Sequence, residues 1–176
     1  MLPAISDNGV NQDGVLSLNS HSTEATEAFG SLLAGFLQPD DIVTLDGDLG
    51  AGKTALTRGI AAGLNCRVPV SSPTFTLLIE HPAIPPGLAL YHFDVYRLGG
   101  SDEFCDAGLD EYFYQGGVCV IEWGRLIVDI LPAHTLEIRL WQVDPEQPDL
   151  RRIEIAWPGA KDRLIEIVAK LVNSEQ

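Results

Sequence analysis

The chain has 176 residues, 45% hydrophobic and 20% charged, which is typical of one globular domain with a core of its own. Eleven basic residues against twenty-five acidic ones give a formal charge of −14, so we expect no independent binding to nucleic acid, which depends on Lys and Arg at phosphates. The three cysteines lack metal-site spacing, no run of 18 apolar residues offers a membrane span, and no signal-peptide pattern is present, so a cytoplasmic protein is expected.

The N-terminal part of the chain predicts one strand and one helix. We expect the polar residues 1–14 to be mobile and residues 15–176 to form the domain. Apolar residues within 15–18 predict a short first strand. Apolar residues at steps of three and four over 25–37 predict a helix, with Ser22 as its N-cap.

The apolar runs later in the chain predict a sheet with parallel strands at its centre. Residues 88–93 and 118–121 are apolar without alternation, as in strands covered on both faces. Short helical pieces, broken at Gly108, are expected between these strands. Alternation over 136–140 and 153–157 predicts a C-terminal antiparallel hairpin with one exposed face, at an edge of the sheet, and a last helix is expected after it.

Residues 47–54, GDLGAGKT, follow a short apolar stretch and match the phosphate-loop spacing G-x-x-x-x-G-K-[ST]. Glycines permit positive φ and let the backbone amides face a phosphate at the positive end of the following helix. Lys53 is expected to contact the β- and γ-phosphates, and the Thr54 hydroxyl to bind Mg²⁺. The motif predicts a nucleoside-triphosphate site, for which the candidate residues are Asp48, Leu49, Gly50, Ala51, Gly52, Lys53, Thr54 and Ala55.

Two acids end the two most apolar strands, and ligands of open α/β sheets bind at the carboxyl ends of strands. Asp94 and Glu122 are therefore candidates for holding the metal and for orienting the attacking water. Thr74, which lies between the loop helix and the Asp94 strand, is a candidate switch residue near the γ-phosphate. The alternatives for these residues are acids that end strands in solvent and a turn threonine after Pro73.

Four motifs occur in the order and spacing of one family: GDLGAGKT at 47–54, SPTF at 72–75, HFDVYRL at 92–98 and IEW at 121–123. Over about residues 16–142 the chain resembles the bacterial TsaE (YjeE) ATPases. The resemblance implies a single α/β domain of the P-loop NTPase type, with a largely parallel central sheet flanked by helices, that uses ATP and Mg²⁺. It implies that Thr54 and Glu122 act on Mg²⁺, that Asp94 supports the metal and the water, and that Thr74 belongs to the switch. Trp123 and Tyr96-Arg97 are implied as functional neighbours.

The resemblance also implies a biological role. Such proteins are accessory ATPases for threonylcarbamoyladenosine (t6A) modification of tRNA at the adenosine beside the anticodon. They act on the TsaD–TsaB transferase complex, so these two proteins are the expected partners and tRNA is met only through the complex. From the residues alone, a small-molecule or nucleotide kinase and a nucleotide-dependent binding module stay open, because both use the same loop. A GTPase is disfavoured, because no Asn-Lys-x-Asp sequence is present.

Overall fold

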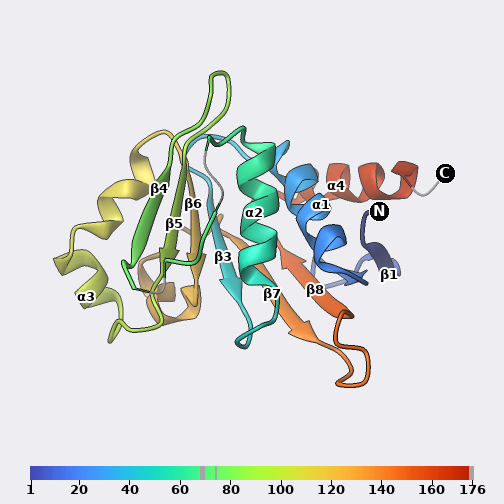
Figure 1. Ribbon diagram of the computed structural model, residues 1–176. Coiled ribbons are helices and arrows are strands. Elements are labelled where there is room, and N and C mark those ends of the chain that lie inside the picture. The colour runs from blue at the N-terminus through green and yellow to red at the C-terminus, as the bar shows by residue number, and fades with distance from the viewer. Residues whose placement is uncertain (68–69, 74, 175–176) are drawn as a thin grey trace.

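The computed structural model describes residues 1–67, 70–73 and 75–174, which form a mixed α/β domain around one sheet of eight strands (Figure 1). In chain order the strands and helices are β1 (Ala4–Val10), β2 (Val15–Ser20), α1 (Thr23–Ala34), β3 (Ile42–Asp46), α2 (Lys53–Gly63), β4 (Leu78–His81), β5 (Leu90–Asp94), α3 (Ser101–Asp106), the 3-10 helix η1 (Leu109–Tyr114), β6 (Val118–Glu122), the 3-10 helix η2 (Gly124–Ile130), β7 (Leu136–Gln142), β8 (Arg151–Ala156) and α4 (Lys161–Ser174). Among the described residues, no helix has the length and apolarity that crossing a membrane requires.

The sheet has the strand order β1-β2-β8-β7-β3-β6-β5-β4, and its centre is parallel. Strand β3 pairs in parallel with both β6 and β7, and β6 pairs in parallel with β5. The remaining neighbours are antiparallel, with β4 at one edge and β1 at the other. These parallel pairings confirm the largely parallel centre that the apolar runs predicted. Strands β5 and β6, which contain those runs, are buried along their whole length.

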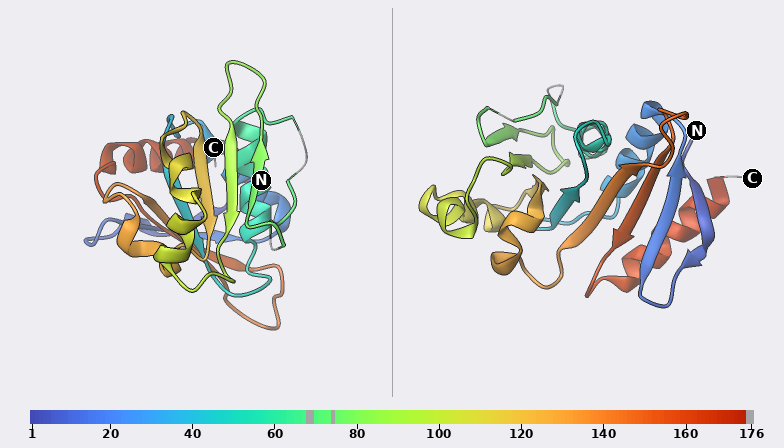
Figure 2. Two further views of the ribbon diagram at one scale, coloured as in Figure 1. Left: turned by 90° about the vertical axis from the view of Figure 1, so that its left-hand side faces the viewer. Right: turned by 90° about the horizontal axis from the view of Figure 1, so that it is seen from below.

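The sheet separates two apolar clusters, because successive side chains of a strand point to opposite faces. One cluster joins Leu90 and Val120 to Phe29 of α1 and to Leu56 and Ile60 of α2. The other lies on the opposite face and joins the strands to α3, η1 and η2 through Phe93, Ile121, Phe104, Phe113 and Ile127. Figure 2 shows these helices on the side of the sheet away from α2. The parallel strands are thus covered on both faces, which explains why their sequences lack alternation.

The helix predicted over 25–37 is confirmed as α1, and its N-cap is Ser22, whose Oγ accepts a hydrogen bond from the backbone N–H of Ala25 at 3.1 Å. The helical pieces predicted within 101–114 are α3 and η1, and they are separated at Gly108, whose φ of 70° suits glycine. Helix α1 packs closely on α2, because Gly30 and Gly59 bring the two backbones into contact.

The position predicted for the C-terminal hairpin is wrong. Strands β7 and β8 do form an antiparallel hairpin, but β7 also pairs with β3 and β8 pairs with β2, so the hairpin lies inside the sheet. Alternation reports that one face of a strand is exposed and says nothing about its lateral neighbours. Residues 1–14, which we expected to be mobile, include the strand β1; it precedes the strand predicted within 15–18, which is β2, and pairs with it at the sheet edge.

Candidate functional site

The glycine-rich loop of residues 47–54 connects the end of β3 to the first turn of α2. Gly47, Gly50 and Gly52 have φ values of 152°, 80° and 107°, in the range that disfavours residues with a Cβ. A Cβ at Gly47 would overlap the backbone carbonyl of Leu140, whereas a Cβ at Gly50 would meet nothing within 4 Å. The loop therefore needs glycine both for its backbone conformation and, at Gly47, for its close approach to β7.

Lys53 is the first residue of α2, and its side chain folds back over the loop. Its Nζ donates hydrogen bonds to the carbonyl oxygens of Gly47 and Asp48, at 2.6 and 3.0 Å, and lies 4.5 Å from the centroid of the Trp123 ring. Burial lowers the pKa of Lys53, and the nearby carboxylates of Glu122 and Asp94 oppose that shift. The ammonium group thus places a positive charge beside the two carboxylates.

Asp94 and Glu122 end the neighbouring parallel strands β5 and β6 and lie directly opposite each other in the register. Both are buried, with exposed fractions of 5% and 4%. The Oδ1 of Asp94 accepts a hydrogen bond from the backbone N–H of Tyr96 at 3.2 Å, and the Oε1 of Glu122 lies 2.9 Å from the Nε2 of His92. Two buried carboxyl groups therefore meet at the carboxyl edge of the parallel strands, as the sequence predicted.

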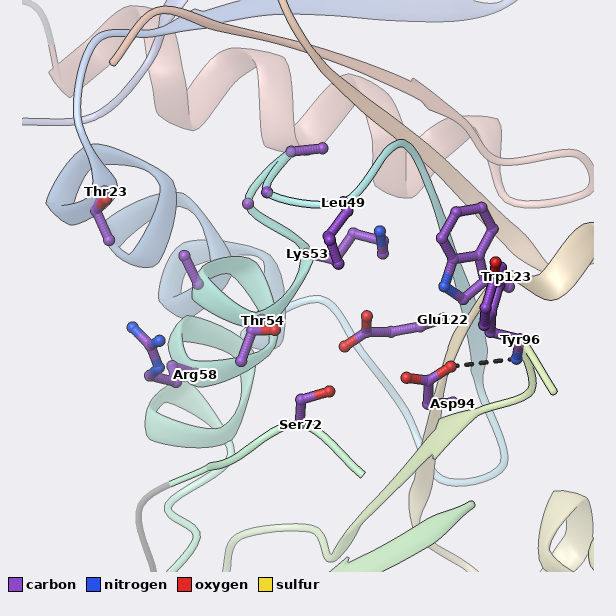
Figure 3. Close-up of a pocket in the computed structure, with 14 residues that line it drawn as sticks. Thr23, Leu49, Lys53, Thr54, Arg58, Ser72, Asp94, Tyr96, Glu122 and Trp123 are labelled. Carbon is purple, nitrogen blue, oxygen red and sulfur yellow. Dashed lines mark hydrogen bonds between the residues drawn. The ribbon is translucent and has the colours of Figure 1, made fainter. Parts of the chain in front are cut away.

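A cavity of about 590 Å³ lies between the loop, the start of α2 and the ends of β5 and β6 (Figure 3). The predicted residues that line it are Leu49, Gly50, Ala51, Gly52, Lys53, Thr54, Ala55, Asp94 and Glu122. Asp48 does not line it, and contributes to the site through the carbonyl that Lys53 contacts. The switch prediction for Thr74 lies outside the described residues. Figure 3 shows the side chains of Lys53, Thr54, Glu122 and Asp94 around the same space.

Five further residues line the cavity, namely Thr23, Arg58, Ser72, Tyr96 and Trp123. Arg58 follows Thr54 by four residues, so helical spacing alone places both on one face of α2, and our sequence reading missed this signal. In the structure Arg58 also forms an ion pair with Glu27 at 2.6 Å. Thr23 begins α1, and no local motif points to it. The Tyr96 and Trp123 rings lie together, with centroids 4.9 Å apart, which puts the two aromatic residues implied by the resemblance at the cavity.

The donor set of the cavity fits a Mg²⁺ ion that is shared with a phosphate ligand. Thr54, Asp94 and Glu122 offer a hydroxyl and two carboxylates, which are the hard oxygen donors that Mg²⁺ prefers. Across the described residues, no group of three or more His, Cys, Asp and Glu side chains is arranged to hold a metal. In proteins Mg²⁺ keeps several waters and is bound through one or two carboxylates together with substrate phosphates, which matches the two carboxylates Asp94 and Glu122 at the cavity.

These features define a mixed α/β protein with a glycine-rich loop, a buried lysine and two buried carboxylates around one cavity. The family model described as threonylcarbamoyl adenosine biosynthesis protein TsaE matches residues 20–152. The chain belongs to this family, which takes part in the biosynthesis of threonylcarbamoyladenosine in tRNA.

Individual relatives agree with the family assignment. The chain is 46% identical over 127 residues to the tRNA threonylcarbamoyladenosine biosynthesis protein TsaE of Bacillus subtilis, covering 72% of this chain and 78% of that protein. It is 43% identical over 121 residues to TsaE of Treponema pallidum, covering 69% and 87%. The crystal structure of Bacillus subtilis YdiB is similar, with a TM-score of 0.69 and 36% identity over 92% of this chain and 97% of that one.

Proposed function

We propose that this chain is a P-loop ATPase that binds ATP with Mg²⁺ in the cavity of about 590 Å³. One observation carries the proposal: the glycine-rich loop, which leads into α2, faces the paired carboxylates Asp94 and Glu122 across that cavity. The backbone amides at the start of α2 favour a phosphate, and the third N–H donor of Lys53 is available to the γ-phosphate. Leu49, Tyr96 and Trp123 also line the cavity and give it apolar surface.

In this proposal Thr54 and Glu122 hold Mg²⁺ and Asp94 supports its shell. The ion, when bound, neutralises charge on the β- and γ-phosphates. The chain's own part is to orient the substrates: Lys53 and the loop amides fix the triphosphate, and a carboxylate at the strand ends accepts a hydrogen bond from the attacking water. In hydrolysis the water oxygen bonds to the γ-phosphorus, the bond between the γ-phosphorus and the β-γ bridging oxygen breaks, and ADP and phosphate are released.

We further propose that the hydrolysis serves the TsaD–TsaB complex during t6A modification of tRNA. The family's role in threonylcarbamoyladenosine biosynthesis supports this, and so does the acidic charge of −14, which suits a protein-binding subunit better than a tRNA-binding one. ATP binding or hydrolysis then resets the complex between rounds of modification. The structure adds no support for the kinase alternative, because Arg58 is the only arginine among the described residues that line the cavity.

The test has two stages. Phosphate release from ATP is measured for the purified chain alone, and then with the TsaD and TsaB proteins of its own organism and unmodified tRNA. We expect slow hydrolysis alone, faster hydrolysis in the mixture, and several rounds of modification per complex only when ATP hydrolysis is intact. Transfer of phosphate from ATP to a small acceptor would instead favour the kinase. Multiple rounds of modification with a Glu122→Gln variant that no longer hydrolyses ATP would refute the resetting role.

A further inference from the structure

His92 lies in the middle of β5, is completely buried, and contacts one of the candidate metal ligands. Its Nε2 is 2.9 Å from the Oε1 of Glu122, which belongs to the neighbouring strand β6. In the parallel register His92 stands opposite Val120 and Asp94 opposite Glu122. Alternate strand residues share a face, so the imidazole and both carboxylates project to the same side of the sheet, toward α2.

The chemistry of the contact assigns the proton. An ionised carboxylate only accepts hydrogen bonds, so a bond between His92 and ionised Glu122 requires the hydrogen on Nε2. The other ring nitrogen, Nδ1, has no hydrogen-bond partner among the described residues. Burying an imidazole is costly unless its polar atoms are bonded, and the bond to Glu122 is what offsets that cost here.

His81, on the adjacent strand β4, shows what a histidine without such a contact looks like. It is 2% exposed, and within the described part of the chain neither of its ring nitrogens has a hydrogen-bond partner. Its ring centroid lies 6.2 Å from that of His92. Burial lowers the pKa of His81, which favours the uncharged ring. His81 is therefore a buried histidine in which neither ring nitrogen is hydrogen-bonded within the described part of the chain, and His92 differs from it by one directed hydrogen bond.

The two carboxylates are held in different ways. Asp94 receives a hydrogen bond from the backbone N–H of Tyr96, two residues further along its own chain. Glu122 receives its bond from a side chain on another strand. A side-chain donor can be removed by substitution without altering the backbone, so the orientation of Glu122 can be tested separately from that of Asp94.

We propose that His92 is a positioning residue, whose Nε2–H holds the Glu122 carboxylate in the orientation in which it faces the cavity. This inference rests on the proposed ATPase function and on the metal-binding role of Glu122. Carboxylates that bind metals are themselves held by hydrogen bonds, and removing such a partner typically lowers metal affinity or activity about 10- to 100-fold. The same size of effect is expected here.

Two amide substitutions separate positioning from packing. In His92→Gln the amide nitrogen lies as many bonds from Cα as the Nε2 of histidine, so it can still donate to Glu122. In His92→Asn it lies one bond closer and falls short. Both variants bury a similar amide group, so their effects on stability are matched. His81→Asn makes the same change at a buried histidine that does not touch Glu122, and serves as the control.

We expect His92→Asn to lower kcat for ATP hydrolysis about 10- to 100-fold with a smaller change in KM. His92→Gln is expected to restore most of the rate, and His81→Asn to stay within about threefold of the parent. Calorimetry gives a second readout: Mg²⁺ is expected to strengthen ADP binding less in His92→Asn than in the parent, while binding in EDTA is the same in both. Equal kcat values for the folded Gln and Asn variants would overturn the positioning role and leave the ATPase proposal standing.

The parent protein offers a test that no folding defect can affect. Imidazole ¹⁵N NMR without nucleotide distinguishes the two neutral tautomers, and we expect the hydrogen of His92 on Nε2. A hydrogen on Nδ1 would overturn the proposed bond. A parent chain that does not hydrolyse ATP, alone or with its partners, would refute the proposed function instead, and the NMR result would still decide whether His92 donates to Glu122.

Discussion

Replacing Lys53 by Met removes the ammonium group and keeps an apolar stem of similar length. The change leaves the loop carbonyls of Gly47 and Asp48 without the donor that now lies 2.6 and 3.0 Å from them. It also removes a positive charge that interacts with the carboxylates of Asp94 and Glu122, which line the same cavity. ATP, an anion, would then meet the two carboxylates without the Lys53 ammonium group beside them, and its affinity is expected to fall.

The size of the expected loss in ATP affinity follows from the number of Lys53 N–H donors that do not contact the loop. An ammonium group has three N–H donors, and two of them are directed at the loop carbonyls. One therefore remains for a phosphate oxygen. A hydrogen bond to a charged group contributes about 1.5–3 kcal/mol, which corresponds to a roughly 10- to 150-fold weaker affinity in Lys53→Met.

Isothermal titration calorimetry with ATP, in EDTA and again in excess Mg²⁺, measures this loss directly. Lys170→Met is the matched control, because it makes the same substitution at an exposed position of α4 that does not line the cavity. The control is expected to bind ATP within about twofold of the parent. A folded Lys53→Met variant that binds as tightly as the control would refute the assignment of the loop as the phosphate site.

Three further predictions concern the carboxylates, the contact between α1 and α2, and a buried thiol. Glu122→Gln and Asp94→Asn are each expected to reduce ATP hydrolysis at least about tenfold while leaving ATP affinity in EDTA unchanged or slightly higher, because each removes a negative charge from the metal and water site. Gly59→Ala is expected to lower the free energy of unfolding by about 3 kcal/mol or more in urea denaturation, since its Cβ would overlap a backbone carbonyl of α1, whereas Gly35→Ala has more room and is the control. Burial raises the pKa of the Cys119 thiol to about 12, so its thiolate fraction at pH 8 is about 10⁻⁴. Alkylation followed by peptide mass spectrometry is therefore expected to show almost no labelling of Cys119 in the native protein at pH 8, and faster labelling as the pH rises.

Each of these predictions has a clear contrary result. If both carboxylate variants hydrolysed ATP at the rate of the parent protein, Asp94 and Glu122 would have only a structural role at the strand ends. Equal stability of the two glycine variants would mean that the helices separate without cost. Rapid labelling of native Cys119 at pH 8 would contradict its burial.

The residues that could be predicted from the sequence are those set by local geometry. The glycine-rich loop and the acids that end apolar strands are short-range patterns, and the structure brings Lys53, Asp94 and Glu122 to one cavity. The contact between His92 and Glu122 was not predictable, because the two residues lie 30 positions apart in the sequence and meet only through the pairing of β5 with β6. The interior position of the hairpin was missed for the same reason. Arg58 was accessible to sequence reasoning, since helical spacing places it beside Thr54.

The interior hairpin has a consequence for how the chain reaches its native state. Leu16 of β2 pairs with Ile155 of β8, and both neighbours of the central strand β3 come from the second half of the chain. During synthesis the N-terminal strands therefore emerge from the ribosome long before the segments that complete their hydrogen bonds. Such sequence-distant pairing slows folding, and unpaired strand edges invite association with other chains. A nascent chain that ends between residues 143 and 150 would contain all of β7 and none of β8, and would leave one edge of β2 and one edge of β7 open.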